Sequence, residues 1–203
     1  MKIFLIHKRS LYSSFFKNKK FPGLSKDLII NHQTHEASVR RVQQVLKKLG
    51  CSFKTILRTS KLNFQPDDLI ITVGGDGTFL RTAHHISTQR ILGVNSDPKH
   101  SVGALCAVSA AGFEKKMREI LEGRAKVQEV TRMTIKLNGK KLALEPINDV
   151  LFANESPAAT SRYVILLRGK REEQKSSGIW IAGPCGSTAG ISAAGGKRQD
   201  NTD

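Results

Sequence analysis

The sequence predicts an α/β fold, with a parallel sheet in an N-terminal domain over residues 1–124 and a mostly β domain over residues 125–203. Two patterns predict this fold. Up to residue 123, short apolar runs alternate with helical runs, which is typical of parallel strands joined by crossover helices. Beyond that point the helical spacing stops, and strand-like runs separated by turn residues follow one another.

The first elements of the N-terminal domain lie on either side of a basic segment. Residues 2–7 are an apolar run that predicts a strand. Residues 8–28 are basic and irregular, with a turn signal at Pro22-Gly23, and predict a surface loop with some local helix. Residues 34–49 carry valine and leucine at helical spacing before Gly50, which predicts an amphipathic helix.

The rest of this domain continues the alternation of strand and helix. Residues 69–73 are apolar and β-branched and predict a buried strand, because turn signals lie at both ends of the run. The next residues predict a helix to about residue 85, with Thr78 as its N-cap. Similar patterns predict strands over 52–57 and 91–94 and a helix over 110–122.

The second domain is predicted to consist mainly of short strands. Asn138-Gly139 is a strong hairpin signal, and it predicts a hairpin whose arms cover residues 127–137 and 140–144. Further strands are predicted over residues 150–153, 163–167 and 178–182.

The composition is typical of a globular protein from a reducing compartment. Hydrophobic residues make up 39% and charged residues 25%, and no apolar stretch approaches the ~20 residues that span a bilayer, so no membrane partner is expected. The apolar run at the N-terminus is too short for a signal-peptide core. Cys51, Cys106 and Cys185 are widely spaced and odd in number, which predicts free thiols and a cytoplasmic location.

The net charge of +16 has two interpretations. Basic side chains attract polyanions such as nucleic acid or phosphorylated small molecules, or they form a scattered solvated surface. We favour the second and expect no nucleic-acid partner, because the aromatic residues, 6% of the chain, are not interleaved with the basic clusters. The pairs His32/His35 and His84/His85 are expected on solvated helix faces, and no metal site is predicted.

The turn between the strand at 69–73 and the following helix consists of Gly74, Gly75, Asp76, Gly77 and Thr78. Glycines let another molecule approach the backbone, and the first N–H groups of a helix have no intrahelical partner, so this turn predicts phosphate binding. Phosphate binding alone does not favour the carboxylate of Asp76. We therefore expect Asp76 to accept a proton from a hydroxyl group, the alternative being a residue that only stabilises its own turn.

Three further segments carry polar groups suited to a ligand. A second glycine-rich segment spans residues 183–196, and its hydroxyls at Ser187 and Thr188 can bind a ligand, although tight packing at a corner also explains it. Asn148-Asp149 combines an amide and a carboxylate, with a plain turn as the alternative. Asn95 follows a predicted strand, and ligands of parallel sheets collect at the carboxyl ends of strands.

Taken together, these segments resemble the NAD kinase family. The resemblance rests on residues 74–80, 93–95, 148–149, 184 with 186–189, and 194–196, in the order found in that family. Family members continue well past the closing Gly-Gly, so a C-terminally truncated copy is expected.

The resemblance implies transfer of the γ-phosphoryl group of ATP to the 2′-hydroxyl of the adenosine ribose of NAD, in a cleft between the two domains. It implies Asp76 as general base, a divalent metal such as Mg²⁺ carried by the nucleotide, and a homo-oligomer. It also implies that substrate is bound by Gly74, Gly75, Gly77, Thr78, Asn95, Asn148, Asp149, Ser187, Thr188, Ala189 and Ser192.

Two alternatives stay open. The Gly-Gly-Asp-Gly-Thr turn also occurs in lipid kinases and, in a close variant, phosphofructokinases, although Asn148-Asp149 and residues 186–189 count against such a phosphotransferase. A non-catalytic nucleotide-binding protein is favoured by the basic charge. The sequence leaves open whether ATP or polyphosphate is the donor and whether NAD or NADH is preferred.

Overall fold

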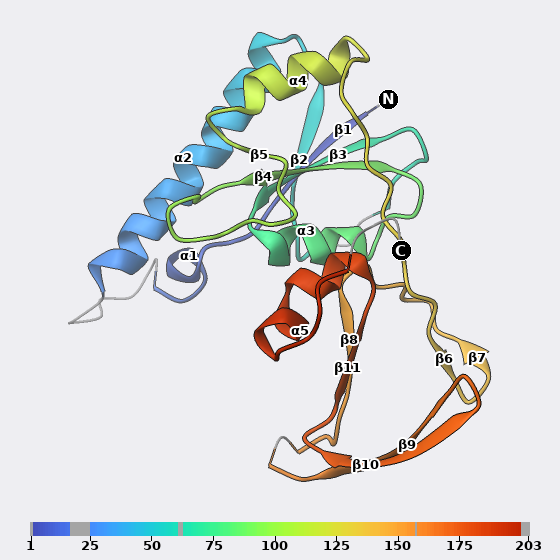
Figure 1. Ribbon diagram of the computed structural model, residues 1–203. Helices are drawn as coiled ribbons and strands as arrows, with labels where there is room; N and C mark the ends of the chain where they lie inside the picture. Colours follow the sequence, from blue (N-terminus) through green and yellow to red (C-terminus); the bar gives the residue numbers. More distant parts are fainter. Residues whose placement is uncertain (1, 17–24, 61–62, 157, 200–203) are drawn as a thin grey trace. The chain divides into compact units, whose positions relative to one another are not determined.

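The computed structural model describes residues 2–16, 25–60, 63–156 and 158–199 (Figure 1). The predicted turn at Pro22-Gly23 lies outside these residues. The chain divides into two compact units, Met1–Val127 (unit 1) and Gln128–Asp203 (unit 2). Each unit has its own secondary structure.

Unit 1 contains a parallel sheet with the strand order β2-β1-β3-β4-β5. The central strand, β3, is buried along its whole length, which explains its continuous apolar sequence. The last residue of β3, Gly74, pairs with the last residue of β4, Asn95, so the carboxyl ends of these two strands lie together. The strands are β1 (Ile3–His7), β2 (Phe53–Leu57), β3 (Leu69–Gly74), β4 (Arg90–Asn95) and β5 (Val108–Ser109), and only β5 was not predicted.

The helices of unit 1 are α1 (Leu11–Phe15), α2 (Lys26–Lys48), α3 (Asp76–Ala83) and α4 (Phe113–Leu121). Helix α2 begins eight residues before the predicted start at 34 (34 − 26 = 8). Its start has a local cause, because the Ser25 side chain accepts a hydrogen bond from the Asp27 N–H and Asp27 places a carboxylate in the first turn.

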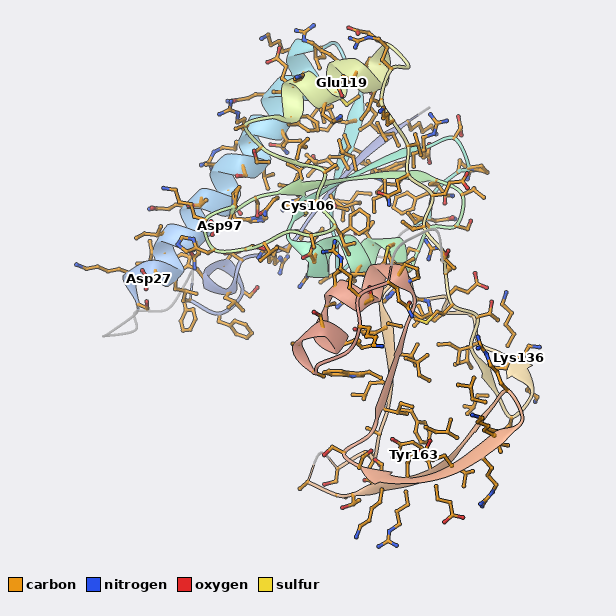
Figure 2. All side chains as sticks on the ribbon, viewed as in Figure 1. Asp27, Asp97, Cys106, Glu119, Lys136 and Tyr163 are labelled. Atoms are coloured by element: carbon orange, nitrogen blue, oxygen red, sulfur yellow. The ribbon has the colours of Figure 1, made fainter. Side chains whose placement is uncertain are left out.

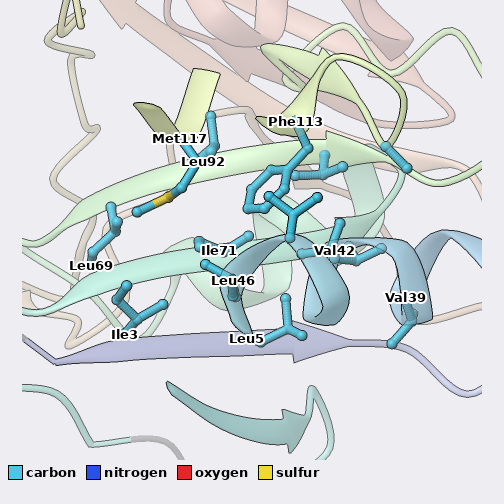
Figure 3. Close-up of a cluster of buried hydrophobic side chains, with 14 residues drawn as sticks. Ile3, Leu5, Val39, Val42, Leu46, Leu69, Ile71, Leu92, Phe113 and Met117 are labelled. Atoms are coloured by element: carbon cyan, nitrogen blue, oxygen red, sulfur yellow. The ribbon is translucent and has the colours of Figure 1, made fainter. Parts of the chain in front are cut away.

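The core of unit 1 lies on both faces of the sheet. Helices α2 and α4 cover one face, where Leu5 and Ile71 pack with Val42, Phe113 and Met117 (Figures 1 and 3). The opposite face buries a smaller apolar cluster of Ile6, Phe64, Ile70 and Ile86. Neighbouring residues of β1 and β3 therefore point to opposite faces, as the period of a strand requires.

Unit 2 is built mainly from pairs of antiparallel strands. The pairs are β6 (Lys136–Leu137) with β7 (Lys140–Lys141), β8 (Asp149–Phe152) with β11 (Ile179–Ala182), and β9 (Ser161–Leu167) with β10 (Lys170–Ser176). A 3₁₀ helix, η1 (Pro184–Thr188), and a short helix, α5 (Gly190–Ala193), follow β11. The predicted β-rich character is confirmed.

In unit 2, one strand prediction was wrong over most of its length and one strand was missed. The predicted arm over residues 127–137 is a strand only at Lys136–Leu137, although Asn138 and Gly139 form the expected turn with φ of 50° and 77°. Strand β10 was missed because its sequence, Lys-Arg-Glu-Glu-Gln-Lys-Ser, has no apolar alternation. It is a strand because it pairs along its whole length with β9, across a turn whose φ values at Arg168 and Gly169 are 49° and 77°.

Candidate active site

The glycine-rich turn joins β3 to α3 at the carboxyl edge of the sheet in unit 1. Gly75 is the N-cap of α3, with extended backbone, and the helix begins at Asp76. The prediction of Thr78 as N-cap was therefore wrong. Thr78 is the third residue of the helix, is 1% exposed, and donates its backbone N–H to the Gly75 carbonyl at 2.9 Å.

Close packing explains why two of these positions are glycine. A Cβ at position 74 would lie 2.3 Å from the Thr78 Oγ1, and a Cβ at position 75 would lie 2.9 Å from the Ser101 Oγ. Both distances are shorter than ordinary contacts of a Cβ atom. A Cβ at Gly77 would meet nothing within 4 Å, and Gly77 is exposed. The backbone at 77 is therefore open to an incoming molecule.

The Asp76 carboxylate is held by a loop that is distant in sequence. Its Oδ2 accepts the Ala104 N–H at 3.0 Å, and its Oδ1 accepts the Leu105 N–H at 2.8 Å. Each oxygen keeps a further lone pair, so the carboxylate is oriented and can still accept a hydrogen bond. A half-buried Asp76 in this position is suited to interact with a hydroxyl group of a ligand.

Asn95 lies beside this turn but uses its side chain within its own loop. Its Nδ2 donates to the Ser101 carbonyl at 2.9 Å, and its Oδ1 accepts the Asp97 N–H at 3.0 Å. The side chain is 6% exposed. Asn95 therefore shapes the loop from 95 to 101, and its predicted role as a ligand residue stays a prediction.

Arg58 is a positively charged residue at this turn that the sequence did not indicate. It directly follows β2, and its Nη1 lies 3.4 Å from the Gly77 carbonyl oxygen and 3.5 Å from the Thr78 Oγ1. Burial and the nearby Arg81 lower the pKa of its guanidinium. Its position after a predicted strand, at the edge where parallel strands end, was the signal in the sequence that could have identified it.

Cys106 lies on the loop between β4 and β5, near the same turn (Figure 2). Its Sγ is 3.9 Å from the Gly74 carbonyl oxygen. Burial, together with the negative charge of Asp76, raises the pKa of its thiol to about 11. Cys106 is thus a neutral thiol near pH 7 and not a nucleophile for the site.

The histidine predictions were partly wrong. His84 and His85 are exposed, as expected, but His35 is 2% exposed. Helical spacing alone did not identify it as a core residue because histidine is polar. In the structure both nitrogens of the His35 ring have hydrogen-bond partners, the Ser96 Oγ and the Lys8 carbonyl, which makes burial possible.

In unit 2, the two polar segments predicted to bind substrate lie next to each other. The Asn148 Nδ2 donates to the Asp149 Oδ2 at 3.0 Å, at the start of β8. A Cβ at Gly186 would lie 1.9 Å from the Asn148 carbonyl oxygen, so only glycine allows this approach. The Asn148-Asp149 pair is therefore in contact with η1, the segment that carries Ser187 and Thr188.

The hydroxyls of the second glycine-rich segment differ in their accessibility. Ser187 is 2% exposed, donates to the Pro184 carbonyl at 2.7 Å and accepts the Gln199 N–H at 2.9 Å. Thr188 and Ser192 are exposed, and Ala189 is half-buried. The accessible hydroxyls of this segment are thus those of Thr188 and Ser192, whereas Ser187 stabilises the segment itself.

Comparison with known proteins identifies the family. The family model described as the ATP-NAD kinase N-terminal domain matches residues 24–125, which include the whole glycine-rich turn, Asn95 and the loop that holds Asp76. The chain belongs to the NAD kinase family. The fold class and the resemblance that the sequence predicted are thereby confirmed.

Curated members of this family from plants and bacteria are similar over most of the chain. It is 34% identical to a "Probable NADH kinase" of Oryza sativa subsp. japonica, over 81% of this chain and 58% of the relative. It is 35% identical to an "NADH kinase" of Arabidopsis thaliana, over 91% and 65%. An "NAD kinase" of Aquifex aeolicus is 31% identical, over 77% and 60%. The chain thus spans less than two thirds of the length of these relatives.

A solved structure supports the fold. The crystal structure of an NAD kinase from Archaeoglobus fulgidus in complex with ATP superposes with a TM-score of 0.66 and 21% sequence identity. The match covers 99% of this chain and 68% of that one. Among the residues that the structure describes, no helix is long and apolar enough to cross a membrane.

Proposed function

We propose that this chain transfers the γ-phosphoryl group of ATP to the 2′-hydroxyl of the adenosine ribose of NAD, forming NADP. The observation that carries the proposal is the carboxylate of Asp76, held by two backbone N–H groups beside the first turn of α3 in a member of the NAD kinase family. A carboxylate at the start of a helix can accept the proton of a hydroxyl group, and the same turn can bind phosphate. Together they are suited to a reaction in which a hydroxyl attacks a phosphoryl group.

The proposed chemistry depends on positioning more than on covalent steps. Phosphoryl transfer proceeds through a loose transition state, so alignment and charge neutralisation provide most of the catalysis. Asp76 accepts the proton of the 2′-hydroxyl as the oxygen attacks phosphorus. The exposed backbone at Gly77 and the N–H groups near Gly75 bind phosphate oxygens, and the cation of Arg58 lies beside them.

Unit 2 contributes the residues that recognise the dinucleotide. Asn148 supplies amide donors and an acceptor, and Asp149 supplies acceptors, a combination suited to vicinal ribose hydroxyls. Their direct hydrogen bond orients both side chains before substrate arrives. Thr188 and Ser192 have exposed side chains whose hydroxyls are accessible to substrate. Ser187 stabilises the conformation of η1, since its own hydroxyl is already hydrogen-bonded within unit 2.

By analogy with the family, the divalent metal is proposed to be carried by the nucleotide. Among the described residues, no three His, Cys, Asp or Glu side chains lie close enough to hold a metal ion. A Mg²⁺ ion carried by the ATP phosphates would neutralise part of their charge. No step assigned to Asp76 or Arg58 requires a protein ligand to this metal.

The cellular setting follows from the same proposal. All three cysteines are free, which is typical of a reducing compartment and supports a cytoplasmic location for NADP synthesis. A homo-oligomer is proposed by analogy with the family. The lipid-kinase and phosphofructokinase-like alternatives, and a non-catalytic nucleotide-binding role, are decided by the assay below.

The test is NADP formation by the purified chain with ATP and Mg²⁺. NADH and polyphosphate are included as second acceptor and second donor, because the rice and Arabidopsis relatives are named NADH kinases. NADP or NADPH formation by the chain, lost in Asp76→Asn, supports the proposal. Binding of NAD without product would select the non-catalytic role, and phosphorylation of diacylglycerol or fructose 6-phosphate alone would select one of the other kinase classes.

A further inference from the structure

Helix α2 contacts the ends of two sheet strands through a buried histidine. The His35 Nε2 lies 3.0 Å from the Lys8 carbonyl oxygen, just after β1. The His35 Nδ1 lies 3.0 Å from the Ser96 Oγ, just after β4. One helical turn further on, the Ser38 Oγ donates to the Ser96 carbonyl at 2.8 Å. Ser96 is thus held through its hydroxyl and its carbonyl by two side chains of α2.

The chemistry of these partners determines the tautomer of His35. A carbonyl oxygen can only accept a hydrogen bond, so the Nε2 must carry the ring proton and donate a hydrogen bond to the Lys8 carbonyl oxygen. The Nδ1 of the neutral ring then accepts a hydrogen bond from the Ser96 hydroxyl. Burial is the main cause that lowers the pKa of His35 to about 4. The hydrogen bond to the Lys8 carbonyl and the charge of Glu36 raise this pKa, while the charges of Lys8 and His7 lower it. The ring is therefore neutral at physiological pH.

Ser96 connects this helix to the glycine-rich turn. Its backbone N–H donates to the Gly74 carbonyl at 3.0 Å, at the residue where β3 ends. It also follows Asn95, whose side chain closes the loop from 95 to 101. The same chain then continues to Ala104 and Leu105, whose N–H groups hold Asp76. Hydrogen bonds and a short stretch of backbone therefore connect His35 to the Asp76 carboxylate within unit 1.

We propose that His35 is a positioning residue, which sets the place of the Asp76 carboxylate through Ser96 and the loop from 95 to 105. The proposal deepens the function proposed above and rests on it for the role of Asp76. It does not require His35 to touch substrate or to change its protonation state during the reaction. Its specific claim is that the bond to Ser96 acts on the site, whereas the bond to Lys8 mainly stabilises the fold.

Two substitutions separate the two bonds of His35. In His35→Asn the amide oxygen takes the place of Nδ1, so the Ser96 hydroxyl keeps an acceptor and the bond to Lys8 is lost. In His35→Gln the longer side chain reaches the place of Nε2, so the bond to Lys8 is kept and that to Ser96 is lost. We expect kcat to fall on the order of tenfold in His35→Gln, with KM within about twofold, and to be largely kept in His35→Asn.

Ser96→Ala and His32→Gln complete the set. Ser96→Ala removes a small hydroxyl, so the fold is kept, and it should lower kcat as much as His35→Gln, with no further loss in the double variant. His32 is the matched control on the same helix. Its Nδ1 lies 2.8 Å from the Ser10 Oγ, which caps α1, and its ring stacks on Tyr12. These contacts lead to α1, so His32→Gln should leave kcat unchanged.

A second measurement does not depend on catalysis. Amide hydrogen exchange at Ala104 and Leu105 reports the bonds to Asp76 directly, without substrate. We expect faster exchange at these two amides in His35→Gln and Ser96→Ala and wild-type exchange in His35→Asn and His32→Gln. Equal kcat and equal exchange in all variants would overturn the proposal. If the wild-type chain forms no NADP, the exchange pattern still decides the positioning role, whereas the proposed function fails by itself.

Discussion

The burial of a neutral His35 makes unit 1 sensitive to mild acid in a way that can be calculated. The side chain is 2% exposed, and burial lowers its pKa from 6.5 to about 4. In the unfolded chain His35 binds a proton as the pH falls through 6.5, while in the folded chain it does so only near pH 4. The unfolded state therefore binds more protons in this window, and the free energy of unfolding falls as the pH is lowered.

The difference between the two pKa values corresponds to about 3 kcal/mol of unfolding free energy. This part of the stability is fully lost once the pH is below the pKa of His35 in the folded chain. A loss of this size is large against the ~5–15 kcal/mol by which a domain is typically stable. This residue alone should therefore make unit 1 about 3 kcal/mol less stable near pH 4 than near pH 7.

Urea unfolding of the wild type and of His35→Gln, followed by circular dichroism, measures this effect between about pH 7 and about pH 4. Glutamine does not titrate, so the stability difference between the two proteins should shrink by about 3 kcal/mol over this range. The pKa values of Glu114 and Glu119 are also lowered, so these carboxylates lose their stabilising effect as the pH falls through their pKa values in the folded chain. This loss is the same in both proteins and cancels in the stability difference. A stability difference that stays constant with pH would refute the argument that His35 is buried and neutral.

Three further predictions concern the glycine-rich turn and the core. Asp76→Asn should lower kcat by about 10²-fold or more, because its amide cannot accept the hydroxyl proton, while Asp27→Asn, in the exposed first turn of α2, should not; initial rates measure both. Gly74→Ala should destabilise the protein by about 1–3 kcal/mol in thermal unfolding, since its methyl would lie 2.3 Å from a buried hydroxyl, and Gly77→Ala, with nothing within 4 Å, should not. Phe113→Ala empties the centre of the larger core cluster and should cost about 3–5 kcal/mol in urea unfolding; a loss below about 1 kcal/mol would contradict the packing in Figure 3.

The elements that were predicted well have local causes. Strand β3 was recognised because both its faces are buried, which requires an uninterrupted apolar run. The turn at Asn138-Gly139 was recognised because both residues adopt positive φ, which few other residues tolerate. Strand β10 and the burial of His35 were missed, because in each case a polar segment or side chain is stabilised by partners that lie elsewhere in the sequence.

The candidate site likewise has features with local causes and features that depend on partners elsewhere in the sequence. The position of the Gly-Gly-Asp-Gly-Thr turn between a buried strand and a helix was predictable from the amino-acid sequence, since glycine, apolar periodicity and helix starts leave local signals. The same motifs predicted the family. No local signal predicted that Asp76 is held by the N–H groups of Ala104 and Leu105, or that the amide of Asn95 closes its own loop; these contacts are visible in the folded chain. The physical reason is that a hydrogen bond depends on which donors the fold brings within 3 Å of an acceptor, and those donors lie up to 29 residues away along the chain.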